Sequence, residues 1–427
     1  MDVIKTSLII GIGLTLYYLL LQWPVNDKVY DSYSQEQIEI DSFNDSERSL
    51  SEPLAPLSQT NQGLVEVANE ELDYFEIQNN DLSLMVESRT GRFEVSSLKN
   101  ITEKKGSEER FSIFGRTYDA GSGKENVYFA NSGFYTRTQG YLNPEFEKIT
   151  EQSGQGNSRV YILEGTSSGL SFSRKIEIED RGYSIKIEDT IKSVLGEDIA
   201  ITPYVVIERD DSAVEESGLM YTYLGPVFSS TKDTYEKYDF DDIKESSYQN
   251  KSVGGWVALI QHYFLSAWIP DQNEEYLYQG RYGDNSGRYS LGYTSRDSIL
   301  SYGEAASTKN TLYVGPKLPK QLVEIEENLD LTVDYGFLWW LGKPMYWFLD
   351  LGHSIFNNWG LAIIFLTVAL KVLTWPLSAK AYVSMGKMRE LAPKMQLLQE
   401  KHGDNRQAMS QELMEVYKKE GVNPLGG

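Results

Sequence analysis

Hydrophobic and polar residues alternate along the middle of the chain, and this alternation predicts β-strands. Residues Arg174–Glu179 alternate with a period of two, Asp180–Gly182 interrupt the pattern, and Tyr183–Glu188 resume it, which is typical of a β-hairpin. Two further pairs of segments show the same signal: Leu82–Val86 with Arg92–Val95, and Trp256–Ile260 with Tyr263–Trp268. Many short strands over residues 71–333 predict a large sandwich of antiparallel sheets, closed by a helix over Pro319–Asn328.

Two continuous apolar stretches stand on either side of this β-region. The first, Ser7–Trp23, follows Lys5, and the residues after it offer no small-residue cleavage site. We therefore expect residues 1–23 to form an N-terminal tail and an uncleaved transmembrane anchor rather than a signal peptide. The second, Trp359–Leu377, would be about 28 Å long as a helix, close to the ~30 Å thickness of a hydrocarbon core. It predicts a transmembrane helix over residues 357–377.

The second apolar stretch contains a charged residue, Lys371. A Lys in the middle of a spanning helix costs roughly 2.5–3.5 kcal/mol, so its presence needs a reason. One interpretation is that the side chain reaches the nearer interface beyond Leu377, about 9 Å away along the helix. Helical side chains lean toward the helix N-terminus, however, which directs this one toward the membrane centre. We therefore favour a polar site within the membrane at Lys371.

The segments that flank the β-region differ from it in composition. Residues 24–70 are rich in Asp, Glu and Ser without a sustained period, and we expect a disordered acidic tether. Residues 334–356 are aromatic with a few polar positions, which is typical of an amphipathic helix at the membrane interface. A third membrane crossing is the alternative for this segment. Lys343–Pro344, Asp350 and His353 argue against that alternative.

A helical hairpin is predicted over residues 378–422. In its first arm, five apolar residues follow one another at intervals of three or four: Met385, Met388, Leu391, Met395 and Leu398. Gly403 provides a helix stop, and Asp404 with Gln407 a capping box for the second arm. The apolar face of that arm consists of Met409, Leu413, Val416 and Tyr417. The methionines could also give an adaptable surface for partners, although packing of the hairpin on itself explains most of these residues.

Charge is distributed unevenly along the chain, whose formal net charge is −22. Residues 24–336 contain 29 basic and 54 acidic residues, whereas residues 378–427 contain 8 basic and 6 acidic ones. The acidic middle argues against sequence-specific binding of nucleic acid. Lys380, Lys387, Arg389 and Lys394 follow the second apolar stretch, and the positive-inside rule puts that side in the cytoplasm. The large domain then lies outside, in a bacterial periplasm, and the protein crosses the inner membrane more than once.

The residues that could support catalysis are sparse. The chain has no cysteine, and its three histidines, His262, His353 and His402, lie in different regions, so no metal cluster is expected. The pairs Asp210–Asp211 and Asp241–Asp242 could serve a glycosidase, but chance placement in so acidic a domain explains them better. We expect neither enzymatic activity nor a cofactor.

Several motifs resemble those of the YidC-type membrane protein insertases of Gram-negative bacteria. They are Tyr235–Phe240 (YEKYDF), Gly254–Ala258 (GGWVA), Ala267–Pro270 (AWIP), Leu329–Gly336 (LDLTVDYG), Asn358–Gly360 (NWG), Lys387–Arg389 (KMR) and Asn423–Gly427 (NPLGG). The likeness covers the chain from the first anchor to the end. It is weakest in the tether and strongest after about residue 235.

The resemblance implies a fold, a function and partners. The fold would be a periplasmic β-super-sandwich with transmembrane helices and a cytoplasmic helical hairpin. The function would be that of an insertase and chaperone for nascent membrane proteins in the phospholipid bilayer, alone or with the Sec translocon, without ATP of its own. Ribosomes and the signal-recognition machinery would be further partners.

Two positions depart from the family pattern. Lys371 would be the substrate-binding residue in a water-containing groove, where the family usually has Arg. Members of the family continue with further crossings after the position of Gly427, so residues 423–427 are expected to begin a transmembrane region that this sequence does not include.

Two other functions fit parts of the sequence. One is a membrane-anchored periplasmic protein that binds or acts on carbohydrate. The other is a scaffold whose hairpin recruits partners while the outside domain touches the secretion channel. Neither explains a charged crossing followed by a basic amphipathic hairpin.

Overall fold

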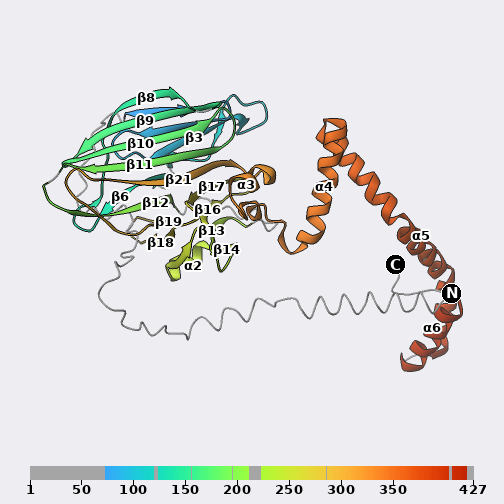
Figure 1. Cartoon of the computed structure of the whole chain (residues 1–427). Coiled ribbons are helices and arrows are strands. Elements are labelled where there is room, and N and C mark those ends of the chain that lie inside the picture. Colours follow the sequence, from blue (N-terminus) through green and yellow to red (C-terminus); the bar gives the residue numbers. More distant parts are fainter. Residues whose placement is uncertain are drawn as a thin grey trace.

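Two antiparallel sheets form the large domain, as the alternation of polar and apolar residues predicts (Figure 1). The first sheet has its main strands in the order β1 (Tyr74–Gln78), β2 (Leu82–Glu87), β3 (Phe93–Thr102), β6 (Lys124–Thr136), β12 (Ile199–Asp210), β19 (Arg288–Thr294), β18 (Glu275–Gly283) and β15 (Tyr248–Val253). Four short strands pair with its inner strands: β4 (Arg110–Ser112) with β3, β5 (Gly115–Asp119) and β7 (Gly140–Tyr141) with β6, and β20 (Ser298–Leu300) with β12. The second sheet has the order β14 (Glu236–Lys237), β13 (Gly225–Ser229), β16 (Trp256–Ile260), β17 (Phe264–Pro270), β21 (Ala305–Pro316), β11 (Ser184–Ser193), β10 (Leu170–Glu179), β9 (Ser158–Ser167) and β8 (Phe146–Ser153).

The computed structural model describes residues 73–119, 124–154, 156–194, 196–210, 223–284, 286–402 and 406–420. The predicted anchor (1–23), the whole predicted tether (24–70) and the segment 423–427 lie outside the described residues. So do the predicted helix stop at Gly403 and its neighbour Asp404.

Strand register follows the hydrophobic pattern in all three predicted pairs. In the β10–β11 hairpin, Ile176 pairs with Ile187 and Ile178 with Ile185, and all four side chains are buried. The pairs β2–β3 and β16–β17 are also antiparallel neighbours. Because a slip of one residue would turn every apolar side chain to the other face, burial of one face fixes the register.

Large aromatic side chains fill the space between the sheets. Trp256 and Trp268 are fully buried, and the Trp268 ring meets Phe93 edge-on with centroids 6.4 Å apart. The Trp268 indole N–H donates to the Val206 carbonyl at 3.0 Å, so this bulky residue is buried with its polar group satisfied.

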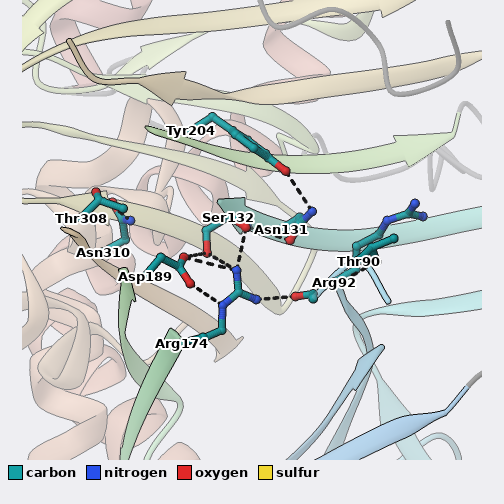
Figure 2. A network of polar contacts seen from close by, with 10 residues as sticks. Thr90, Arg92, Asn131, Ser132, Arg174, Asp189, Tyr204, Thr308 and Asn310 are labelled. Carbon is teal, nitrogen blue, oxygen red and sulfur yellow. Dashed lines mark hydrogen bonds and ion pairs between the residues drawn. The ribbon is translucent and has the colours of Figure 1, made fainter. Parts of the chain in front are cut away.

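A buried ion pair within the second sheet is also hydrogen-bonded to the first sheet (Figure 2). Arg174 on β10 donates from Nε to Oδ1 of Asp189 on β11 at 2.6 Å. Its Nη2 donates to the Ser132 carbonyl on β6, in the other sheet, at 2.6 Å, and its Nη1 to the Gly91 carbonyl. Arg174 and Asp189 are 1% and 4% exposed, and the Ser132 hydroxyl also donates to Asp189, so protein groups rather than water compensate the two charges.

The helices comprise one short helix inserted in the sandwich and those that follow it. They are α2 (Phe240–Glu245, inserted before β15), α3 (Pro319–Ile325), the 3-10 turns η2 (Leu329–Thr332) and η3 (Gly336–Leu338), α4 (Trp339–Phe356), α5 (Trp359–His402) and α6 (Arg406–Glu420). Helix α3 is shorter than the predicted Pro319–Asn328 because Glu326 is extended and Asn328 is left-handed, with a φ of 65°. Helix α4 begins after η3 rather than at residue 334.

Helix α5 is a continuous helix of 44 residues that contains Pro376 and Pro393. The predicted boundary at 377/378 between the spanning segment and the hairpin therefore falls within one helix, not at a break. The hairpin packs through Leu391 and Tyr417, with Met388, Leu413 and Val416 around them, as the spacing predicts. Met385 was expected in the same seam but is 39% exposed.

Candidate functional site on helix α5

The helices α4 and α5 meet at a tight elbow (Figure 1). Asn357 adopts a left-handed φ of 48° and ends α4, and its N–H donates to the His353 carbonyl. The Asn358 side chain then accepts the Leu361 N–H at 3.2 Å, as a helix N-cap does. The His353 ring stacks on Trp359 with centroids 3.9 Å apart. Gly352 is buried where α4 touches Ala362, so the two helices approach closely at this point.

Replacing Gly352 with Val is expected to loosen this elbow by about 1–3 kcal/mol, the usual cost of overpacking. A Cβ at Gly352 would lie 3.1 Å from a Phe365 ring carbon and 3.2 Å from the Ala362 Cα. Gly386→Val is the matched control, since Gly386 is also inside a helix, α5, but a Cβ there meets nothing within 4 Å. Thermal unfolding of the full chain in detergent, with limited proteolysis at the elbow, measures the difference. Equal behaviour of the two variants would show that close helix contact at Gly352 contributes nothing.

Helices α4 and α5 expose more large apolar side chains than is usual on the surface of a soluble protein. On α4, Trp340, Trp347 and Leu351 are spaced by seven and four residues and are all exposed, so they form one apolar face. On α5, the segment Trp359–Pro393 has a mean hydropathy of 1.9 in its most apolar window, and 6% of that window is buried. Among the described residues it is the one helix long and apolar enough to cross a bilayer. Exposed apolar surface of this size fits a lipid environment.

Lys371 lies on the exposed surface of α5, twelve residues after the helix begins. Thr367 and Thr374 lie four residues before it and three after it, so the three polar residues share one face of the helix. Both threonine hydroxyls donate to backbone carbonyls of their own helix, those of Ile363 and Leu370, at 2.8 Å. The Lys371 ammonium has no ion pair or hydrogen bond with any part of the chain that the structure describes. Its three donors are thus available to another molecule.

The threonines beside Lys371 were missed from the sequence, although their spacing of four and three residues was readable. They make the charge part of a polar stripe rather than an isolated residue. Hydroxyls that are already bonded to the backbone are inexpensive to place in lipid, so the stripe concentrates its unsatisfied polarity at Lys371.

A second cluster joins the sandwich to α4. The motif segments 235–240, 254–258 and 329–336, far apart in sequence, meet here: Lys237 forms an ion pair with Asp334, and the Tyr235 and Trp256 rings lie 6.4 Å apart. Burial lowers the pKa of the nearby Lys317 to about 8, against the opposing effect of Asp334. These contacts hold the end of the sandwich to the segment that leads into α4.

The acidic pairs considered for glycosidase chemistry have structural roles where they are described. Asp241 and Asp242 form the first turn of α2, and Asp242 accepts the Asp239 N–H at 3.2 Å, as in a capping box. Asp210 is buried and accepts the Val127 N–H, while Asp211 lies outside the described residues. Carboxylates at a helix N-terminus are stabilising, which accounts for the pair on α2 without catalysis.

A β-sandwich that leads through an amphipathic helix into an apolar helix of spanning length defines a membrane-inserted protein with a large domain on one side of the bilayer. Two family models match: "YidC periplasmic domain" over residues 75–348 and "60Kd inner membrane protein" over residues 351–427. The chain belongs to the YidC family of membrane protein insertases. Members of this family are inner-membrane proteins with a periplasmic domain.

Relatives named "Membrane protein insertase YidC" support the assignment. The one from Mannheimia succiniciproducens is 34% identical over all of this chain and 77% of its own length. That from Pseudomonas fluorescens is 32% identical over all of this chain and 78% of its own, and that from Actinobacillus succinogenes is 39% identical over 82% and 65%. These matches confirm the resemblance predicted from the motifs and do not favour the carbohydrate alternative.

Among solved structures, a GH36 α-galactosidase from Geobacillus stearothermophilus matches 57% of this chain and 41% of its own. The TM-score is 0.40 and the identity 8%, a similarity too distant to support a statement about function.

Proposed function

We propose that Lys371 is the polar contact through which this insertase receives the hydrophilic flank of a substrate while its apolar segment enters the lipid. The observation that carries the proposal is an ammonium group on an exposed apolar helix whose donors have no partner among the described residues. An uncompensated charge at this position has a cost, and a substrate carboxylate or carbonyl would relieve it. The role extends to Thr367 and Thr374 as the rest of the polar stripe.

Insertion is favoured when the hydrophilic flank of the substrate crosses a short polar path while its apolar segment moves along an apolar surface. Burial of apolar surface contributes about 25 cal/mol per Å², so a whole spanning segment gains far more than its flank loses. The obstacle is the transfer of unsatisfied polar groups across lipid, each costing several kcal/mol. A fixed cation partway across the membrane lowers that obstacle for acidic or polar groups. The exposed apolar side chains around it, such as Ile364 and Val368, offer the departing segment a lipid-like surface.

The proposed orientation has the hairpin in the cytoplasm and the sandwich in the periplasm, in a protein that crosses the membrane more than once. Its support is the basic group Lys380, Lys387, Arg389 and Lys394 on the hairpin side of the apolar stretch. The proposal includes the Sec translocon, ribosomes and the signal-recognition machinery as partners, reached from the two sides of the membrane. It assigns the protein no catalytic step and no cofactor.

Site-specific photocrosslinking tests the proposal directly. A photoreactive amino acid at Thr367, on the Lys371 face, is expected to crosslink to a stalled nascent membrane protein made by ribosomes. The control position is Leu373, which is 74% exposed but lies two residues from Lys371 and therefore faces away from it. The protein is expressed from its own gene in both cases. Equal crosslinking from the two positions, or none from Thr367, would rule out a substrate path along this face.

A further inference from the structure

Three apolar side chains are exposed at the end of the sandwich that carries α3, and we propose that they touch the outer surface of the inner membrane. This basal patch consists of Tyr263 in the β16–β17 turn, Leu318 and Val323, which are 69%, 39% and 57% exposed. The inference goes beyond substrate insertion and assigns a lipid-binding surface to the large domain. It rests on the membrane orientation proposed above.

The residues of the basal patch lie on segments that adjoin one another. The Lys317 N–H donates to the Tyr263 carbonyl at 2.9 Å, which places Leu318 beside the turn. Val323 lies on α3, whose Leu322 is fully buried and anchors the helix to the sandwich. Val323 therefore has a fixed position at the surface rather than one on a free loop.

An ion pair at the surface marks the point where this end of the sandwich lies against α4. Lys320 on α3 contacts Asp350 on α4, with Nζ and Oδ2 2.9 Å apart. Val323 follows Lys320 by three residues, so it neighbours Lys320 on the helix surface. Figure 1 shows α3 on the side of the sandwich that is nearest α4.

The two faces of α4 then identify lipid as the occupant. Lys343 and Asp350 are seven residues apart and share one side of α4, which flanks the apolar face of Trp340 and Trp347 at intervals of three and four residues. With the apolar face in the membrane, Asp350 lies at headgroup level, and so does Lys320 on α3, with which it forms the ion pair. The basal patch continues the interfacial surface of α4, and tyrosine is a residue that favours this level of a bilayer.

The chain contains a matched control near the other end of β21, the strand that leads into the basal patch at Leu318. Tyr302 and Val194 are 71% and 56% exposed, and they adjoin through the bond from the Gly303 N–H to the Ser193 carbonyl. Strand β21 runs twelve residues from that end to Pro316, a length of about 40 Å. Exposure is therefore equal at the two ends, and only the distance from α4 differs.

Single-cysteine labelling tests the inference in the full chain. The sequence has no cysteine, so Tyr263→Cys, Val323→Cys, Tyr302→Cys and Val194→Cys each give one labelling site for an environment-sensitive nitrobenzoxadiazole dye. The proteins are reconstituted in vesicles of phosphatidylethanolamine and phosphatidylglycerol, with and without lipid spin-labelled near the headgroup. We expect a blue-shifted emission and loss of most fluorescence to the spin label at 263 and 323, and neither effect at 302 and 194.

Trp347→Cys on the apolar face of α4 separates this inference from the proposed orientation. Quenching at 347 without quenching at 263 and 323 would overturn the basal patch alone. Absence of quenching at 347 would overturn the orientation of α4 and the inference with it. A blue shift at 263 and 323 that spin-labelled lipid does not quench would identify a protein contact, and equal quenching at all four sandwich positions would show unspecific adsorption. Both results would overturn the proposal.

Discussion

Lys371→Glu is expected to abolish insertion, whereas Lys371→Arg is expected to retain it. The attraction between Lys371 and a substrate carboxylate at 4 Å is about 4 kcal/mol at an effective dielectric constant of 20, and charge reversal turns it into repulsion. A change of several kcal/mol corresponds to a loss on the order of 100-fold or more in rate. Arg preserves the charge and adds donors. Growth of a strain depleted of its own insertase, with protease protection of a substrate protein, measures both variants.

The control for this comparison is the amount of each variant in the membrane. Acidic and basic residues cost similar amounts, about 2.5–3.5 kcal/mol, at the centre of a spanning helix, so the Glu variant is expected to reach the membrane as the Lys form does. A defect with normal membrane levels then belongs to substrate handling. Equal growth of the Glu and Arg variants would contradict a role for the positive charge.

Asp189→Ala is expected to destabilise the sandwich by about 3–5 kcal/mol, because it leaves the Arg174 charge buried without its carboxylate. Replacing both residues, as Arg174→Met with Asp189→Leu, is expected to restore much of that stability, since neither buried charge remains. The lower unfolding temperature of the single variant, and its recovery in the double variant, are measurable by circular dichroism of the full chain in detergent.

A neighbouring surface pair supplies the comparison for Asp189. Lys309 on β21 lies 3.8 Å from Glu188 on β11, but its side chain is 73% exposed. Lys309→Ala is therefore expected to cost less than about 1 kcal/mol. If Asp189→Ala proves no more destabilising than Lys309→Ala, the inter-sheet network is not a major source of stability.

The local pattern predicts the strands well because burial of one face imposes a period of two on the sequence. The same pattern places Arg174 in the inward row with Ile176 and Ile178, and the register of the predicted hairpin puts Asp189 directly opposite it on the next strand. Another partner of Arg174, Ser132, comes from β6 in the opposite sheet, and its approach depends on how the sheets face each other. Contacts of this kind are properties of the assembled sandwich and cannot be read from one segment.

In the helical region the composition of each segment is predictable, but the helix boundaries and the contacts between segments are not. The apolar stretch and its charge were evident from composition, yet the continuity of α5 through Pro376 was not. A proline removes one backbone bond and disfavours helix in the residue before it, so it is read as a boundary. The ion pairs Lys237–Asp334 and Lys320–Asp350 join residues 97 and 30 positions apart, and no local signal indicates them. The fold was thus more predictable than the joints between its parts.

The continuity of α5 has a mechanical consequence. Forty-four residues make a rod of about 66 Å, roughly twice the thickness of a hydrocarbon core. Residues 359–402 contain no loop, so a force that displaces α5 at Leu391 also acts on the part of the helix that carries Lys371. Pro376 lies five residues from Lys371 and is the weakest point for bending between the two. Lys371 and the packing residue Leu391 therefore lie on one continuous helix, and a movement of either one relative to the other requires bending near Pro376.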